Sequence, residues 1–427
     1  MAVTATDAHR AIDAVWRIES ARLIAGLTRV VRDLGLAEEL AQDALVAALE
    51  RWPESGIPDN PGAWLMATAK NRAIDLLRRS KLQDRKHEEV GHEMEMKREM
   101  AVSELEAAVD DDVGDDLLRL VFISCHPVLS TEARVALTLR LLGGLTTDEI
   151  ARAFLVPEPT IAQRIVRAKR TLADKQVPFE VPRGPDLAAR LSSVLEVVYL
   201  VFNEGYSATA GDDWMRPGLC EDALRLGRIL AQLVPAEPEV HGLVALMEIQ
   251  ASRSAARVGP SGEPILLLEQ NRARWDQLLI RRGLMGLARA EQLGGAHGPY
   301  VLQAAIAACH ARARAAADTD WPHIAALYEE LARVAPSPVV ELNRAVALAM
   351  AFGPAVGLEL VDALVSEPSL ARYHLLPSVR GDFLAKLGRL DEACAEFERA
   401  ASLTRNARER VLLLDRAAAC ARGQAPG

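Results

Sequence analysis

The chain has 427 residues and a formal net charge of −9; half of its residues are hydrophobic and only 4% are aromatic. The length predicts roughly two to four domains, and the alanine- and leucine-rich composition favours helices over sheets. Five scattered cysteines without a C-x-x-C pair argue against a zinc site and indicate a reduced protein.

The first eighty residues predict three amphipathic helices. Apolar spacing indicates helices over 12–35 and 36–52, with a break near Gly35, and places Leu40, Ala44 and Trp52 on one face of the second. Residues 53–62 (PESGIPDNPG) are rich in turn formers and predict a loop. A third helix is expected from about Pro61 to Lys86. Its inner stripe is predicted to be Ala63, Met66, Ala67, Ile74 and Leu77.

An acidic segment separates this part from the next. Residues 81–116 carry thirteen acidic and five basic side chains, whereas the segments on either side (1–80 and 117–178) together carry nineteen basic and sixteen acidic side chains. The acidic segment fits a solvated tether. The surplus of basic charge in the flanking segments permits DNA contact, but it is too small for strong autonomous DNA binding.

Residues 115–143 predict further helix, and residues 145–172 read as a helix-turn-helix. Thr146 and Glu149 form a capping box at the start of its first helix. Residues 155–158 supply the turn. Pro157 and Pro159 lie near the start of the second helix, where a missing backbone N–H costs little stability. The second helix has an apolar stripe of Ile161, Ile165, Ala168 and Leu172, which leaves a basic face outward. An ordinary helical hairpin with a solvated basic face is the alternative.

After a boundary rich in proline and glycine, the chain from residue 179 predicts successive helices with an internal repeat. The positions Ala345, Leu348, Gly357, Val361 and Leu364 are matched 36 residues later by Gly381, Leu384, Ala393, Phe397 and Ala400. This period is close to the tetratricopeptide repeat, and stacked repeats would offer a surface for another protein. A purely structural helical tail remains the alternative.

The three N-terminal features occur in the order typical of one bacterial family. Residues 36–52 (LAEELAQDALVAALERW), residues 60–79 (NPGAWLMATAKNRAIDLLRR) and the helix-turn-helix resemble an extracytoplasmic-function (ECF) sigma factor. The segments VFNEGY (201–206) and LNRAVA (342–347) resemble the subgroup with a tetratricopeptide-like C-terminal extension.

The resemblance implies an all-α protein with four parts. Residues 1–80 would be the sigma region 2 domain, 81–114 the acidic linker, 115–178 the region 4 domain, and 179–427 the helical C-terminal domain. It implies core RNA polymerase and promoter DNA as partners, and the linker would thread through the basic cleft of the polymerase. A solvated tether explains the composition of the linker equally well.

The resemblance also assigns roles to individual residues. Contacts to the polymerase are expected from Glu38, Glu39, Gln42 and Asp43. Contacts on the −10 side, where a base is flipped out of the duplex, are expected from Asp59, Asn60, Lys70, Asn71, Arg72, Arg78 and Arg79. Contacts to the −35 element in the major groove are expected from Glu158, Thr160, Gln163, Arg164 and Arg167.

The sequence offers no enzyme motif. Its histidines share no ligand spacing with each other or with cysteine, and P-loop, G-x-S-x-G and dinucleotide-binding fingerprints are absent. We therefore expect no catalytic residue, no metal and no cofactor. No signal sequence or apolar run of roughly 18 residues is present, so we expect a cytoplasmic protein without membrane contact. Two other functions remain open: an autonomous regulator whose repeats sense a ligand, and a repeat scaffold without a DNA role.

Overall fold

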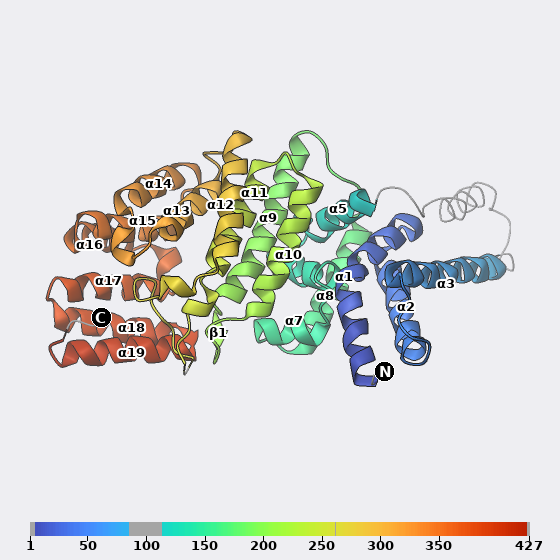
Figure 1. The fold of residues 1–427 in the computed structure, drawn as a ribbon, viewed down its shortest axis with the longest axis horizontal. Helices are drawn as coiled ribbons and strands as arrows, with labels where there is room; N and C mark the ends of the chain where they lie inside the picture. Colours follow the sequence, from blue (N-terminus) through green and yellow to red (C-terminus); the bar gives the residue numbers. More distant parts are fainter. Residues whose placement is uncertain (1–4, 85–112, 261, 425–427) are drawn as a thin grey trace. The chain divides into compact units, whose positions relative to one another are not determined.

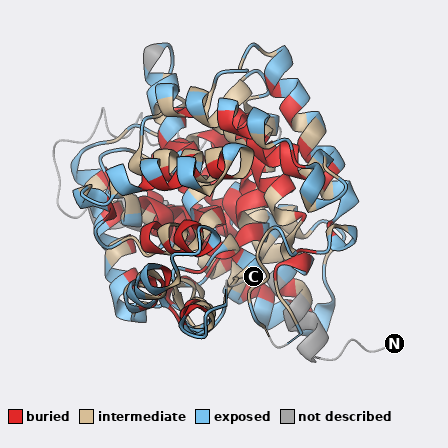
Figure 2. Cartoon of the chain, turned by 90° about the vertical axis from the view of Figure 1, so that its left-hand side faces the viewer, coloured by how far each residue is buried: buried red, intermediate tan, exposed pale blue. Residues whose placement is uncertain are grey.

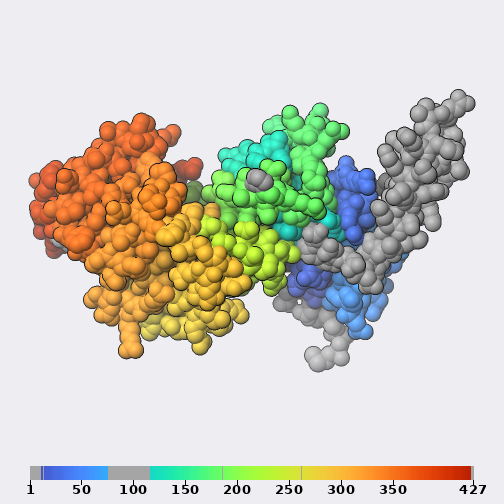
Figure 3. Space-filling view, turned by 90° about the horizontal axis from the view of Figure 1, so that it is seen from above, coloured from blue at the N-terminus to red at the C-terminus, as the bar shows by residue number. Residues whose placement is uncertain are grey.

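The computed structural model describes residues 5–84, 113–260 and 262–424 (Figure 1), and residues without described side chains are among those drawn grey in Figure 3. It consists of two compact units, Met1–Val197 and Val198–Gly427. The described residues are overwhelmingly helical, which confirms the all-α prediction. The strands among them are the two-residue β1 (Ala210–Gly211) and β2 (Arg405–Asn406), which pair in parallel.

The first unit begins with α1 (Ala5–Val31), α2 (Leu34–Ser55) and α3 (Pro61–Asp84). The break between α1 and α2 lies at Arg32 and Asp33, not at Gly35 as predicted. Arg32 takes a left-handed conformation with φ 54°, and the Asp33 carboxylate caps α2 by accepting a hydrogen bond from the Leu36 N–H at 2.8 Å. Asp33 therefore acts as the start signal for α2.

The inner face of α3 differs from the predicted stripe. Ala63 and Ala67 are exposed, while Leu65, Ala69 and Ala73 are buried. The helix is oriented by packing of large side chains, including an edge-to-face contact between Trp52 and Trp64 with ring centroids 5.2 Å apart. Alanines occur on both faces, so their spacing alone did not define the buried side.

The second part of the unit comprises α5 (Val113–Ser124), α6 (Thr131–Leu141), α7 (Thr147–Phe154) and α8 (Glu158–Asp174). The predicted capping box is present: the Thr146 hydroxyl accepts from the Glu149 N–H, and the Glu149 carboxylate accepts from the Thr146 N–H. Leu155 ends α7 in a left-handed conformation, with φ 51°. The predicted stripe of α8 is buried at all four positions. The helix-turn-helix is therefore confirmed in its helices, turn and core.

The first turns of α9 (Pro185–Tyr206) pack within the first unit. The Arg190 guanidinium donates to the Phe122 carbonyl at 2.9 Å, and the Ser193 hydroxyl donates to the Cys125 carbonyl at 2.6 Å. These contacts tie residues beyond the predicted boundary at 178/179 to α5, and the two units divide after Val197.

The second unit continues as successive helices, with one long connection, residues 252–276, between α11 and α12 (Figure 1). They are α10 (Pro217–Leu233), α11 (Pro238–Ala251), α12 (Gln277–Gln292), α13 (Pro299–Arg312), α14 (Trp321–Val334), α15 (Pro338–Phe352), α16 (Pro354–Leu364), α17 (Leu375–Lys386), α18 (Leu390–Leu403) and α19 (Ala407–Ala421). Their buried residues lie on the faces that the helices turn toward one another (Figure 2).

The predicted repeat corresponds to the pairs α15–α16 and α17–α18, whose buried residues form one core cluster. The glycines lie where helices approach closely. A Cβ on Gly357 would come within 2.5 Å of the Ala349 Cβ, and one on Gly381 within 3.0 Å of the Phe397 ring. Small residues at these positions thus permit the helix contacts that the repeat predicted.

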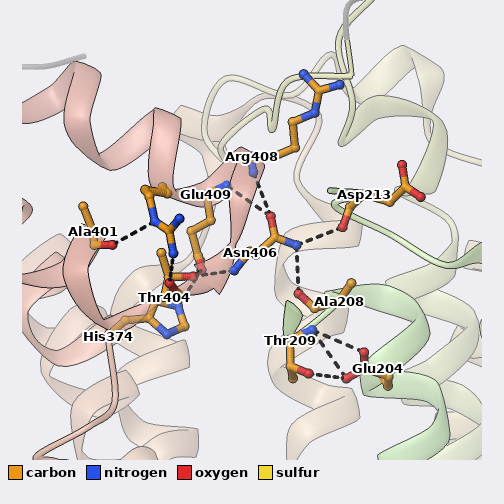
Figure 4. A network of polar contacts seen from close by, with 11 residues as sticks. Glu204, Ala208, Thr209, Asp213, His374, Ala401, Thr404, Asn406, Arg408 and Glu409 are labelled. Atoms are coloured by element: carbon orange, nitrogen blue, oxygen red, sulfur yellow. Dashed lines mark hydrogen bonds and ion pairs between the residues drawn. The ribbon is translucent and has the colours of Figure 1, made fainter. Parts of the chain in front are cut away.

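Asn406 joins the two ends of the second unit (Figure 4). Its side-chain amide donates to the carbonyls of Ala208 at 3.1 Å and Asp213 at 2.8 Å, in the segment after α9. Its side-chain oxygen accepts from the backbone N–H groups of Arg408 and Glu409, and so caps α19. Asn406 is 1% exposed. This one side chain therefore both starts the last helix and holds it to the beginning of the unit.

Candidate nucleic-acid interface

The outward face of α8 is the candidate surface for the DNA major groove. Opposite its buried stripe, Glu158, Thr160, Gln163 and Arg167 are all exposed. The Arg167 guanidinium lies 3.5 Å from the Gln163 side-chain oxygen, one turn away on the same helix. Both side chains therefore lie together on one open helical face.

Arg164 lies differently from the other four candidates because it is half-buried. The hydrogen bonds at the start of α6 and, to a smaller degree, the positive charge of Arg164 lower the pKa of Glu132. The guanidinium is therefore close to α6, at the side of the helix-turn-helix and not at the centre of its outward face.

Sequence reasoning missed one exposed residue on this face. Val166 is 64% exposed, although it belongs to the helix whose other branched aliphatic residues are buried. An exposed apolar side chain on a recognition helix suits contact with the methyl group of thymine. The sequence already places Val166 outside the apolar stripe of α8. A single exposed valine is common on protein surfaces, however, so this position alone did not indicate a DNA contact.

The residues predicted for the −10 side differ in their surroundings. Asp59 and Asn71 are exposed. Asn60 caps α3, since its side-chain oxygen accepts from the Ala63 N–H at 3.0 Å, so only its amide group is left for another partner. Lys70 is half-buried, and its pKa is lowered by burial and by the nearby Arg29. The side chains of Arg78 and Arg79 lie outside the described residues.

The remaining −10 candidate, Arg72, contacts a polymerase candidate. Its guanidinium lies 3.0 Å from the Asp43 carboxylate, and the two side chains are 38% and 50% exposed. An ion pair this open contributes only about 0–1 kcal/mol. Either residue can therefore exchange its partner for a phosphate or a protein side chain at little cost.

Glu38 is the one docking candidate that does not face solvent. Its side chain is 6% exposed and forms ion pairs with Arg140 of α6, at 2.6 Å, and with Lys169 of α8. Gln42 donates a further hydrogen bond to it at 2.7 Å. Burial alone would raise the pKa of the Glu38 carboxyl, but Lys169 and Arg140 outweigh burial and hold the pKa below its ordinary value. In this arrangement Glu39 is exposed and Glu38 is not.

Two further ion pairs join α1 to the second part of the unit. Arg17 lies 2.7 Å from Glu149, the same carboxylate that completes the capping box. Arg29 lies 3.0 Å from Asp116, whose side chain is 5% exposed. The α1–α3 and α5–α8 parts of the first unit are therefore in direct contact, and these four ion pairs cross between them.

A pocket borders this contact. It has a volume of about 730 Å³, is partly open to solvent and lies between α1, α2 and α8, with Arg29, Arg32, Lys169 and Arg170 in its wall. The two parts of the first unit therefore meet through ion pairs beside a solvent-accessible pocket.

No group of three or more His, Cys, Asp or Glu side chains that could hold a metal ion occurs in the part of the chain that the structure describes. Within the same residues, no helix is long and apolar enough to cross a membrane.

Comparison with known families divides the chain at similar places. Residues 18–83 match the family described as Sigma-70 region 2, and residues 119–172 match Sigma-70, region 4. Residues 190–291 match a family of unknown function. The first two matches coincide with the α1–α3 and α5–α8 parts of the first unit.

Individual relatives match either most of the chain or its N-terminal part. An uncharacterized protein of Rhizobium meliloti is 42% identical over 384 residues, which cover 90% of this chain and 89% of that protein. The ECF RNA polymerase sigma factor SigK of Mycobacterium ulcerans is 31% identical over 34% of this chain and 75% of its own length. The probable ECF RNA polymerase sigma factor SigI of Mycobacterium tuberculosis is 26% identical over 40% of this chain and 58% of its own length. No solved structure matches the chain.

Proposed function

Because the chain belongs to the extracytoplasmic-function family of RNA polymerase sigma factors, we propose that it binds core RNA polymerase and directs transcription initiation at specific promoters. The observation that carries this proposal is the open face of α8, where Thr160, Gln163 and Arg167 are exposed above a fully buried stripe. Glutamine and arginine are suited to purine edges, and a helix of this size fits the major groove.

The −10 element would be read by α3 and the loop before it. Asn71 is exposed and would contact a base edge, while Lys70 and Arg72 would bind the phosphate backbone. Asp59 and Asn60 remain the candidates for the flipped base. For Asn60 this role is restricted to its amide group, because its oxygen caps the helix.

The polymerase would dock on α2 through Glu39, Gln42 and Asp43. Glu38 can contribute to docking only after its ion pairs with Arg140 and Lys169 have opened. The proposed docking surface is therefore acidic and centred on the exposed Glu39.

The docking proposal is tested by reversing two exposed charges, Glu39→Lys together with Asp43→Lys. Core polymerase binding, measured by co-migration on size exclusion and by fluorescence anisotropy, should weaken at least about tenfold. A matched control is Glu54→Lys with Glu50→Lys, two exposed acidic residues near the end of the same helix. Undiminished binding by the first double variant would contradict the proposed surface.

For the second unit we propose a positive role in transcription, with the helical repeats as a surface for another protein. Its function is tested by removing residues 198–427, which leaves the contacts of Arg190 and Ser193 to the first unit intact. The truncated protein should remain folded and transcribe less from a cognate promoter. Stronger transcription by the truncated protein would show that the second unit is inhibitory.

A further inference from the structure

A cavity of about 260 Å³ lies inside the second unit, away from every residue that the sigma-factor role uses. Side chains from five helices line it: Tyr199 of α9, Gln250 of α11, Gln303 and His310 of α13, Tyr328 of α14 and Asn343 of α15. Leucine and isoleucine side chains complete the wall, and Arg253 is its one permanently charged member. None of the described residues that line it is acidic.

Among the residues that the structure describes, no carboxylate forms an ion pair with Arg253. One terminal nitrogen of its guanidinium donates to the Tyr206 hydroxyl and to the Gln250 side-chain oxygen, both of which are neutral. The group lies 5.6 Å from the centroid of the Tyr206 ring and 5.8 Å from that of Trp275. Its Nε is buried and has no hydrogen-bond partner.

Two more arginines increase the positive charge around Arg253. Arg257 is 7% exposed, donates to the Tyr206 carbonyl and lies 3.5 Å from the centroid of the same ring. Arg272 donates to the carbonyls of His310 and Ala313 and to the Thr319 hydroxyl. All of these acceptors are neutral. Asp318 is the one carboxylate close enough to act on Arg272.

His310 supplies a second, independent feature. It lines the cavity, is 9% exposed, and its Nδ1 is buried without a hydrogen-bond partner. Burial, together with the charges of Arg253 and Arg272, lowers the pKa of His310 to about 4, so the ring is neutral at pH 7. A buried polar atom without a partner costs free energy, so its presence beside a cavity favours a ligand that completes its hydrogen bonding.

From the uncompensated Arg253, the unpartnered His310 Nδ1 and the polar wall, we propose that this cavity binds a small organic anion. Arg253 would hold a carboxylate or phosphate group of the ligand, and the amides of Gln250, Gln303 and Asn343 would bind its hydroxyl or carbonyl groups. The volume equals that of roughly nine water molecules, which suits a metabolite-sized acid and is too small for a peptide. The proposal is independent of the sigma-factor role.

Binding is tested on the full-length protein by thermal unfolding and titration calorimetry with four probes. Citrate and 2-oxoglutarate present carboxylates on an aliphatic chain that also bears a hydroxyl or a keto group, 4-hydroxybenzoate presents a carboxylate and a phenol, and glycerol 3-phosphate presents a phosphate. Each is compared with sodium chloride at equal ionic strength, because general salt effects must be subtracted. At least one probe should raise the Tm by about 5 °C at saturation, and the effective probe identifies the anionic group.

Three variants localise the binding. Arg253→Met should weaken the effective probe at least about tenfold and leave the Tm without ligand unchanged or higher, because it removes an uncompensated buried charge. Ala307→Leu fills the cavity while it keeps Arg253, and should abolish binding as well. Arg282→Met removes the same charge from an exposed position on α12 and should change nothing.

The proposal is overturned if no probe raises the Tm beyond the chloride control, or if the Arg253 variant binds as tightly as the parent protein. A purely structural role of the arginines predicts a different pattern. In that case Arg253→Met would lower the Tm without ligand, and all four probes would act alike on the parent and on both cavity variants.

Discussion

Replacing Glu38 by glutamine separates its two conceivable roles. The substitution keeps the shape of the side chain but removes the charge that Arg140 and Lys169 neutralise. If Glu38 joins the α1–α3 part to the α5–α8 part, the variant should be less stable and should still bind core polymerase. If Glu38 is mainly a docking residue, stability should hardly change and polymerase binding should fall.

The size of the stability effect follows from burial. Removing one partner from a buried ion pair costs about 3–5 kcal/mol when the remaining charge is left without solvent. Here the Arg140 and Lys169 side chains are 20% and 22% exposed, so water can partly solvate them. We therefore expect a loss of about 2 kcal/mol, which lowers the Tm of the first unit by roughly 4–8 °C.

The contact also has a defined pH dependence. The pKa of Glu38 is lowered below 4.5 in the folded protein. Its stabilisation is therefore complete above about pH 4.5 and is lost as the pH falls through the lower, folded-state value. Acid should thus reduce the difference in stability between the parent protein and the Glu38→Gln variant.

The assay is thermal unfolding of both proteins between pH 7 and pH 4, together with core polymerase titration at pH 7. Glu39→Gln is the matched control, because the neighbouring carboxylate is exposed and its loss should change stability by less than about 0.5 kcal/mol. Equal stability of the two variants, or a loss of polymerase affinity specific to Glu38→Gln, would refute the reasoning.

Three other predictions address DNA reading and the second unit. Arg167→Ala should weaken promoter binding by about 1–3 kcal/mol in a competition assay. Arg164→Ala should weaken it less, because Arg164 is half-buried near α6. Equal effects of the two substitutions would contradict this placement of Arg164. Asn406→Asp should lower the free energy of unfolding in urea by about 3–5 kcal/mol, because a buried carboxylate would face two carbonyl oxygens. The control is Asn271→Asp, because the Asn271 side-chain oxygen only accepts from the Ala273 N–H and a carboxylate can do the same. Similar losses of stability in the two variants would disprove the donor role of Asn406. The pKa of His310 is lowered from 6.5 to about 4, so the second unit should be fully stable above pH 6.5 and lose up to about 3 kcal/mol of stability as the pH falls toward 4. His310→Gln should remove this dependence of stability on pH. An unchanged pH dependence in the variant would exclude His310 as its source.

The helix-turn-helix could be predicted because its signals are local. A capping box needs two residues three positions apart, and the stripe from Ile161 to Leu172 needs only the period of one helix. The same holds for the small residues at Gly357 and Gly381, which belong to a pattern repeated after 36 residues that predicted paired helices.

What the sequence did not predict depends on contacts between distant residues. In the sequence, Glu38 does not differ from an ordinary exposed acidic residue near the start of a helix. Its partners Arg140 and Lys169 lie 102 and 131 positions further along the chain. The buried side of α3 follows from how Trp64 packs on Trp52, which alanine spacing does not encode. Likewise, nothing in the separate positions of Arg253, Gln303 and His310 indicated that they line one cavity.

The central claim, that this chain gives RNA polymerase its promoter specificity, is tested most directly by reconstituted transcription. Purified core polymerase is mixed with the full-length protein and a library of promoter fragments, and the starts of the transcripts are sequenced. We expect starts downstream of one shared pair of −35 and −10 sequences, and these starts should disappear when Arg167 and Gln163 are both replaced by alanine. Transcripts with no shared upstream sequence, or no transcripts above those of core polymerase alone, would contradict the claim.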